Sequence, residues 1–174
     1  MIISVNELKR NPKFAEYDDE VLEMELRAIE QAIRSYTNNN FQDRRKRIVC
    51  PSWDGVLQGA GPWFKAGDTV EVSKSNNAGL YAITAVNGEK ITLDGELYDE
   101  VQNYVTKVVY PADVVAGAVR MLDWKLTQSD KVGVQSETIS RHSVTYFNMD
   151  GDNSIMGYPK SLLGFLKPYK CVRF

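Results

Sequence analysis

The fold is organised around residues 18–38, which read DDEVLEMELRAIEQAIRSYTN. Apolar side chains recur there at alternating spacings of four and three, which places them on one face of an α-helix. Asp18 is suited to cap the first turn, and Asp19 and Glu20 place negative charge at the positive end of the helix dipole. Asn38 tolerates the left-handed conformation at a helix C-terminus. The pattern predicts an amphipathic helix whose apolar face needs a partner.

A second helix supplies that partner. It is expected to open at Tyr110-Pro111, because proline is favoured at the first helical position. Shorter helices are predicted after Ser4, which begins a capping box, and over Lys160 to Leu166, where Pro168 ends the helix. The expected core consists of Leu22, Leu26, Ile29, Ile33 and Tyr36 from the first helix and Val115, Leu122 and Leu126 from the second.

The middle of the chain has a different pattern. Glycines are frequent from Ile48 to Tyr110, and alternation of period two replaces the helical period. Asn87-Gly88 is the preferred pair for a two-residue hairpin turn. These features predict a small antiparallel β-barrel-like module whose two ends lie close together. The predicted fold class is α+β, a small helical bundle host (1–47 and 110–174) with an inserted β module (48–109).

Composition limits the classes of function. The net charge is -2, so a general excess of positive charge does not indicate nucleic-acid binding, although a local basic surface remains compatible with it. Two widely separated cysteines, Cys50 and Cys171, do not favour a disulfide-stapled or zinc-bound fold. A signal-peptide pattern and a run long enough to span a membrane are both missing. We expect a soluble protein made or assembled inside a cell, without membrane association.

Candidate chemistry is sparse. His142 is the one histidine, and a solvated loop residue is the simpler interpretation, since catalytic triads depend on geometry. Asp150-Gly151-Asp152-Asn153 begins like a calcium loop, but the later ligands are missing. Gly59-Ala60-Gly61 is not followed by the lysine of a phosphate-binding loop. We expect no catalytic residue, cofactor or metal, and no enzyme activity.

One charge run stands out, formed by Arg44, Arg45, Lys46 and Arg47. It is either a solvated link or a basic surface that contacts a phosphate backbone or an acidic partner. The aromatic residues of the β module, Trp53, Trp63 and Phe64, are expected to fill its core; if exposed, they would be contact residues.

The C-terminal tail carries a second set of candidates. Pro168 cannot continue a helix, and the residues after it combine charge with apolar groups. Tyr169, Val172, Arg173 and Phe174 either fold back on their own domain or dock on a partner.

Two segments carry a resemblance to a known family. The first is Tyr17 to Thr37, with its acidic turn, helix and closing Tyr36-Thr37 pair, and the second is Ser143 to Tyr146 followed by Gly157 to Tyr169. Together they resemble the head–tail connector proteins of long-tailed phages, also called adaptor or head-completion proteins. The resemblance covers the helical host and does not extend to the β module.

The resemblance implies a structural virion protein at the head–tail junction, made in the host cytoplasm. Such a protein forms a homo-oligomeric ring, twelvefold in the virion and monomeric when alone, between the portal protein and a tail or stopper protein. DNA passes through it without sequence-specific contact, and neither a reaction nor a cofactor is implied. The alternative from another class is a small nucleic-acid-binding module that uses the β insert and Arg44 to Arg47.

Overall fold

The computed structural model describes residues 1–128, 136–139, 142–145 and 153–172. The chain divides into two compact units, which we call the barrel unit and the helical unit. The barrel unit comprises Met1–Glu7 and Asn39–Tyr110, and the helical unit comprises Leu8–Asn38 and Pro111–Phe174. A short helix, α1 (Val5–Leu8), begins after Ser4, whose Oγ accepts a hydrogen bond from the Glu7 N–H as the capping box predicts.

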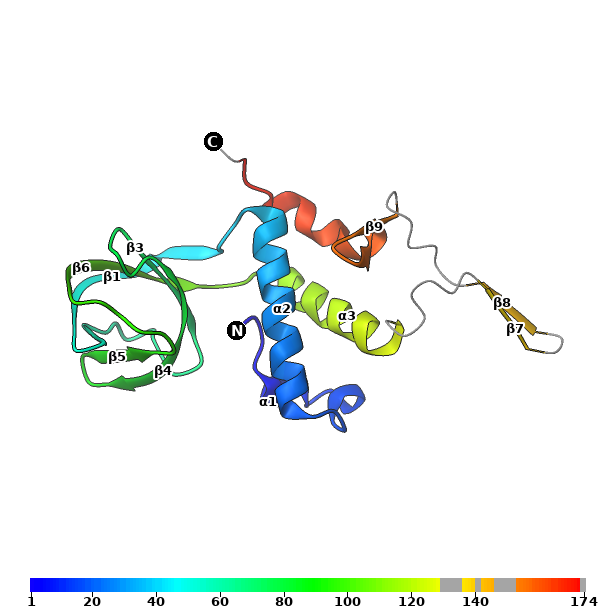
Figure 1. Ribbon diagram of the computed structural model, residues 1–174, viewed down its shortest axis with the longest axis horizontal. Coiled ribbons are helices and arrows are strands. Elements are labelled where there is room, and N and C mark those ends of the chain that lie inside the picture. Colours follow the sequence, from blue (N-terminus) through cyan, green and yellow to red (C-terminus); the bar gives the residue numbers. More distant parts are fainter. Residues whose placement is uncertain (129–135, 140–141, 146–152, 173–174) are drawn as a thin grey trace. The chain divides into compact units, whose positions relative to one another are not determined.

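The barrel unit is a closed antiparallel barrel of six strands (Figure 1). Its strand order is β1-β2-β5-β4-β3-β6. The strands are β1 (Gln42–Trp53), β2 (Val56–Gln58), β3 (Thr69–Ser73), β4 (Gly79–Asn87), β5 (Lys90–Leu93) and β6 (Glu100–Val108). Closure gives every strand two neighbours, which is one way for a small β domain to avoid edge-to-edge association.

Two tight turns set the register of the barrel. Asp54 and Gly55 both have positive φ, and Trp53 pairs with Val56 across them, which is the turn type that Asp-Gly favours. The second turn lies one residue later than predicted, because Asn87 pairs with Lys90 and Gly88 is the first central residue with φ 60°. Glycine adopts that conformation without strain.

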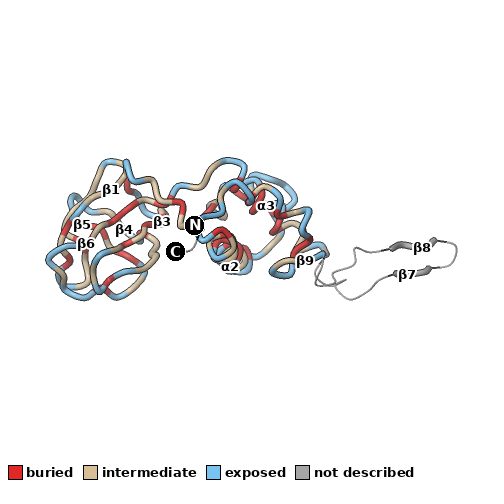
Figure 2. Tube along the Cα trace, turned by 90° about the horizontal axis from the view of Figure 1, so that it is seen from above, coloured by how far each residue is buried: buried red, intermediate tan, exposed pale blue. Residues whose placement is uncertain are grey.

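The chain enters and leaves the barrel at neighbouring positions. Gln42, at the start of β1, pairs with Val108, at the end of β6. The Phe41 and Tyr110 rings lie 4.9 Å apart just outside the strands. The prediction that the two ends of the inserted module lie close together is therefore confirmed. The buried core of the barrel consists of apolar side chains from all six strands, with Phe64 and Leu97 from the loops. In Figure 2 the buried positions along the barrel strands are red.

The helical unit is built on α2 (Asp19–Thr37) and α3 (Ala112–Gln128). Asp18 caps α2 by accepting from the Glu20 and Val21 N–H groups, and Asn38 ends it in the left-handed conformation, so both predicted helix ends are confirmed. The other elements are η1 (Pro12–Phe14), β7 (Ser136–Ile139), β8 (His142–Thr145), β9 (Ser154–Ile155), β10 (Tyr158–Pro159) and η3 (Lys160–Tyr169). The pairs β7–β8 and β9–β10 are antiparallel.

The core of the helical unit differs in part from the predicted one. Leu22, Leu26, Ile29 and Ile33 of α2 and Leu122 of α3 are buried, but Tyr36, Val115 and Leu126 are only half-buried. Val114, Ala118 and Met121 are buried instead. The adjacent residues Val114 and Val115 fit the helical period equally well. In the structure the face with Val114, not the one with Val115, is buried where α3 packs against α2 and η3. A Cβ on Gly117 would lie 2.1 Å from the Phe165 ring, so this glycine allows α3 and η3 to approach closely.

The prediction of a small helical bundle as the host of the β module is wrong. The protein is α+β, but the six-stranded sheet is its largest element and no helical bundle hosts it. Among the described residues only α2 and α3 exceed two turns of α-helix, and the last helix is a 3-10 helix that continues through Pro168 to Tyr169. The segment from Arg44 to Arg47, for which a solvated link was one of two interpretations, lies in the first half of β1. The many charges of this segment are unlike those of a buried strand, but a barrel strand can expose one face to water and carry charges there.

Candidate partner-binding surfaces

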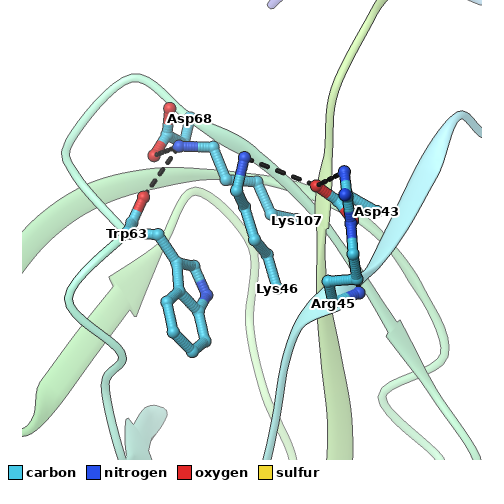
Figure 3. A network of polar contacts seen from close by, with 6 residues as sticks. All are labelled: Asp43, Arg45, Lys46, Trp63, Asp68 and Lys107. Carbon is cyan, nitrogen blue, oxygen red and sulfur yellow. Dashed lines mark hydrogen bonds and ion pairs between the residues drawn. The ribbon is translucent and has the colours of Figure 1, made fainter.

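The basic run lies on β1 and is partly neutralised. Arg45 Nε is 3.1 Å from Asp43 Oδ1, and Lys46 Nζ is 3.4 Å from Asp43 Oδ2 (Figure 3). The hydrogen bonds from Arg45 hold the pKa of Asp43 below its usual value, and Asp43 in turn raises the pKa of Arg45. Arg44 is exposed, and within the described part of the chain it has no ion pair. The run therefore presents a basic surface centred on Arg44 and Arg45.

Arg47 has a structural role. Its Nε donates to Thr106 Oγ1 at 2.7 Å, which ties β1 to β6, and a second nitrogen reaches Gln42 Oε1 at 3.5 Å. The guanidinium also lies 5.9 Å from the centre of the Tyr104 ring, and Lys74 Nζ lies 4.7 Å from it. Two cations against one ring form a basic-aromatic cluster on the outer surface of the barrel. This cluster could not be predicted from the sequence, because Lys74 and Tyr104 are far apart in the chain.

One end of the barrel, which we call the entry end, is where β1 begins and β6 ends. There Lys107 Nζ donates to the Trp63 carbonyl at 2.8 Å and to Asp68 Oδ2 at 2.6 Å (Figure 3). The Lys107 side chain is 15% exposed and the Asp68 side chain 10% exposed, so this ion pair is largely removed from solvent. This ion pair holds the loop before β3 against β6. The prediction that Trp63 and Phe64 fill the core of the barrel is confirmed, because Phe64 is buried and Trp63 packs against the same core.

The opposite end, which we call the far end, is held by a buried polar network. Asn77 Nδ2 donates to Ser52 Oγ, the Tyr98 carbonyl and Asn103 Oδ1 at 2.9–3.1 Å. Asn77 Oδ1 accepts from the Tyr98 N–H at 2.7 Å, and Asn103 Nδ2 donates to Ser52 Oγ at 3.0 Å. Ser52, Asn77 and Asn103 are at most 2% exposed. The network fixes the loops before β4 and β6, because breaking it would leave buried polar groups unpaired.

Large apolar side chains are exposed around this fixed end. Tyr98 is 72% exposed and Val101 78%, and Trp53 is 43% exposed on the neighbouring strand β1. Trp53 thus departs from the expected core role. An exposed cluster of this kind on a rigid support is typical of a contact surface.

The C-terminal tail folds back in part on its own unit. The Tyr169 hydroxyl donates to Asp113 at 2.8 Å, a bond that raises the pKa of Tyr169. Lys170 Nζ lies 3.8 Å from the centre of the Tyr36 ring, and the Cys171 N–H donates to the Thr37 carbonyl at 2.8 Å. Val172 is 73% exposed, and Arg173 and Phe174 lie outside the described residues. Of the four tail candidates, Tyr169 is therefore engaged within the helical unit.

The remaining sequence candidates give no site. The Gly59-Ala60-Gly61 segment lies against Cys50 and Trp63, where a Cβ on Gly59 would meet Cys50 at 2.7 Å. Asp150 to Asp152 lie outside the described residues. His142 begins β8, and the surroundings of its side chain are not described. Within the described ranges no group of three or more acidic, cysteine or histidine residues could hold a metal ion. None of the helices described is long and apolar enough to cross a bilayer.

Comparison with known proteins adds no family. Neither a protein-family model nor a curated protein sequence matches this chain. Functional assignment therefore depends on the residues and geometry given above.

Proposed function

We propose that this protein is a structural subunit of a phage head–tail connector. In this proposal it forms a ring between the capsid portal and the tail or stopper protein, through which DNA passes without sequence-specific contact. It carries out no reaction and binds no cofactor. Its place is the head–tail junction of the virion, after synthesis in the host cytoplasm.

The observation that carries the proposal is how the two resembling segments meet. Tyr36 and Thr37, which close the first segment, receive Lys170 and Cys171, which directly follow the second. Thr37 is buried, and its Oγ1 donates to the Ile33 carbonyl at 2.7 Å. Residues 17–37 and 157–169, which carry most of the resemblance, thus pack in one unit, and this supports reading them together as a single motif.

Attachment to heads tests the proposal. Labelled protein is mixed with DNA-filled, tailless heads that carry portals, and with heads assembled without portal protein. We expect the protein to co-sediment only with the portal-bearing heads and to appear in electron micrographs as added density at the portal vertex. Equal binding to both kinds of head, or binding to neither, would refute the proposal.

A second candidate function, a nucleic-acid-binding module, is favoured by one observation. The Arg47–Tyr104–Lys74 cluster combines positive charge with an aromatic ring, and Arg44 and Arg45 lie on the same strand as Arg47. This candidate requires tight DNA binding by the isolated protein at physiological salt, which weakens steeply as salt rises. A connector subunit should bind weakly or not at all as a monomer.

Fluorescence anisotropy of a labelled oligonucleotide separates the two functions. The informative variant is Arg44→Gln with Arg45→Gln, which leaves the structural bonds of Arg47 intact. Glu89→Gln, at an exposed turn of the barrel, is a matched control for a change of charge. Tight binding that the arginine variant loses and the control keeps would favour the nucleic-acid module over the connector.

A further inference from the structure

The barrel is electrically polarised along its strands. Because the barrel is closed and antiparallel, the turns alternate between the entry end and the far end. The far end carries a single lysine, Lys74, and five carboxylates: Asp54, Asp94, Glu96, Asp99 and Glu100. The entry end carries four carboxylates, Asp43, Asp68, Glu71 and Glu89, and seven basic residues: Arg44, Arg45, Lys46, Arg47, Lys65, Lys90 and Lys107.

The far end has the features of a preformed contact surface. Its exposed apolar groups are Trp53, Tyr98 and Val101, and carboxylates are their neighbours in the sequence at Asp54, Asp99 and Glu100. The Tyr98 backbone is held on both sides, since its N–H donates to Asn77 and its carbonyl accepts from Asn77 and Ser52. Ordering this loop on binding costs little, because the loop is already fixed in the free chain.

The entry end offers the complementary surface. Arg44, Arg45, Lys65 and Lys90 are exposed, and Val109, at 40% exposure, adds an apolar contact beside them. The ion pair between Lys107 and Asp68 and the bond from the Lys65 N–H to Asp68 hold the loop that carries Lys65. This end is therefore also built on fixed backbone.

Charge decides which surfaces can meet. Two far ends would bring ten carboxylates together, and two entry ends would bring together two basic clusters, so contacts between like ends are repulsive. A far end against an entry end is attractive. Such a pairing joins two different surfaces and is heterologous, the type of contact that produces rings when its rotation closes.

We propose that copies of this chain associate head to tail, with the far end of one barrel bound to the entry end of the next. This inference deepens the proposed connector function, because it names the contact that builds the ring. The occupant of the apolar far end is thus a second copy of the chain. The contact weakens as ionic strength rises, because charges at its rim are screened.

Two complementary variants test the pairing. The far-end variant combines Tyr98→Lys with Val101→Lys, and the entry-end variant combines Arg44→Glu with Lys65→Glu. All four side chains are exposed, so both variants should fold. Met24→Ser, at a 62% exposed position on α2, is the control for loss of an exposed apolar side chain. Native mass spectrometry and light scattering give the masses in solution over protein concentrations up to about 1 mM.

A heterologous contact predicts an unusual result. The parent and the control should be monomeric when dilute and form species larger than dimers only as concentration rises toward about 1 mM, whereas each double variant alone should associate at least about tenfold more weakly. A mixture of the two double variants should give a heterodimer and nothing larger, because each partner has one intact end. Contact between like ends could not produce this pattern.

Three results would overturn the pairing. They are a parent protein that stays monomeric throughout the range, double variants that associate like the parent, or a mixture that stays monomeric while the parent associates. The first result would leave the far end to a partner of another sequence. None of them bears on the head-attachment test, which reads binding to the portal, so the two proposals fail separately.

Discussion

Asn77→Ala should destabilise the barrel by releasing the loop at its far end. The Asn77 amide makes four hydrogen bonds of 2.7–3.1 Å to Ser52, Asn103 and the backbone of Tyr98. Alanine removes all four and leaves the Tyr98 N–H without its acceptor. At about 1 kcal/mol for a net hydrogen bond and about 1–3 kcal/mol for a buried group left unpaired, the expected loss is about 2–4 kcal/mol.

Urea unfolding and hydrogen exchange measure this effect. A loss of that size is smaller than the roughly 5–15 kcal/mol total stability of a typical domain, so the variant should still fold. The Tyr98 amide should exchange much faster than in the parent. The neighbouring Asn76→Ala is the matched control, because exposed Asn76 bonds among the described residues only with Glu100, and its loss should change stability by less than about 0.5 kcal/mol.

An Asn77→Ala protein that unfolds like the parent, with Tyr98 still protected, would refute the reasoning. It would mean that the loop is fixed by other contacts. The same variant should also weaken the association of copies, since the exposed Tyr98 ring is carried by the released loop. An Asn77→Ala protein that is less stable but associates like the parent would count against the far end as a preformed surface.

Three further predictions concern the rest of the chain. Ile29→Ala, at 1% exposure, should cost about 2–5 kcal/mol in urea unfolding, and a variant that unfolds like the parent would mean the wrong helix face was assigned. Burial raises the pKa of the Cys50 thiol from 9.0 to about 11. The stability that the buried neutral thiol contributes is therefore fully present below pH 9, and about 2–3 kcal/mol of it is lost as pH rises through 11. Cys50→Ala should lack this dependence, and a thiol reagent at pH 8 should modify exposed Cys171 but not Cys50 unless the protein unfolds. Deleting residues 170–174 should cost about 0.5–1.5 kcal/mol, because the bond from Cys171 to Thr37 is lost, while a larger loss would make the tail part of the core.

The sequence predicted α2 closely because every local signal agreed. Its apolar period, the Asp18 cap and the Asn38 end are all properties of neighbouring residues, and the structure confirms the helix and both ends. The second helix was placed correctly, but its buried face was not, since adjacent Val114 and Val115 fit the period equally well. Which of the two valines is buried depends on packing against α2 and η3, which are distant in the sequence.

The barrel and its surfaces depend on contacts that the sequence does not reveal. The start of β1 pairs with the end of β6, more than 60 residues away, and its charges resemble those of a solvated link. Asn77 and Asn103 are buried polar residues, which composition alone assigns to loops. The polarity of the barrel likewise appears only when the strand order shows which turns share an end.

The connector proposal is tested most directly by the mass of the complex that the protein forms with purified portal. We expect a discrete complex in which several copies sit as one ring on the portal, visible as an added tier in electron micrographs. The complex should form at physiological salt without DNA. A mixture in which the portal and this protein remain separate, while the protein binds DNA tightly at the same salt, would contradict the account.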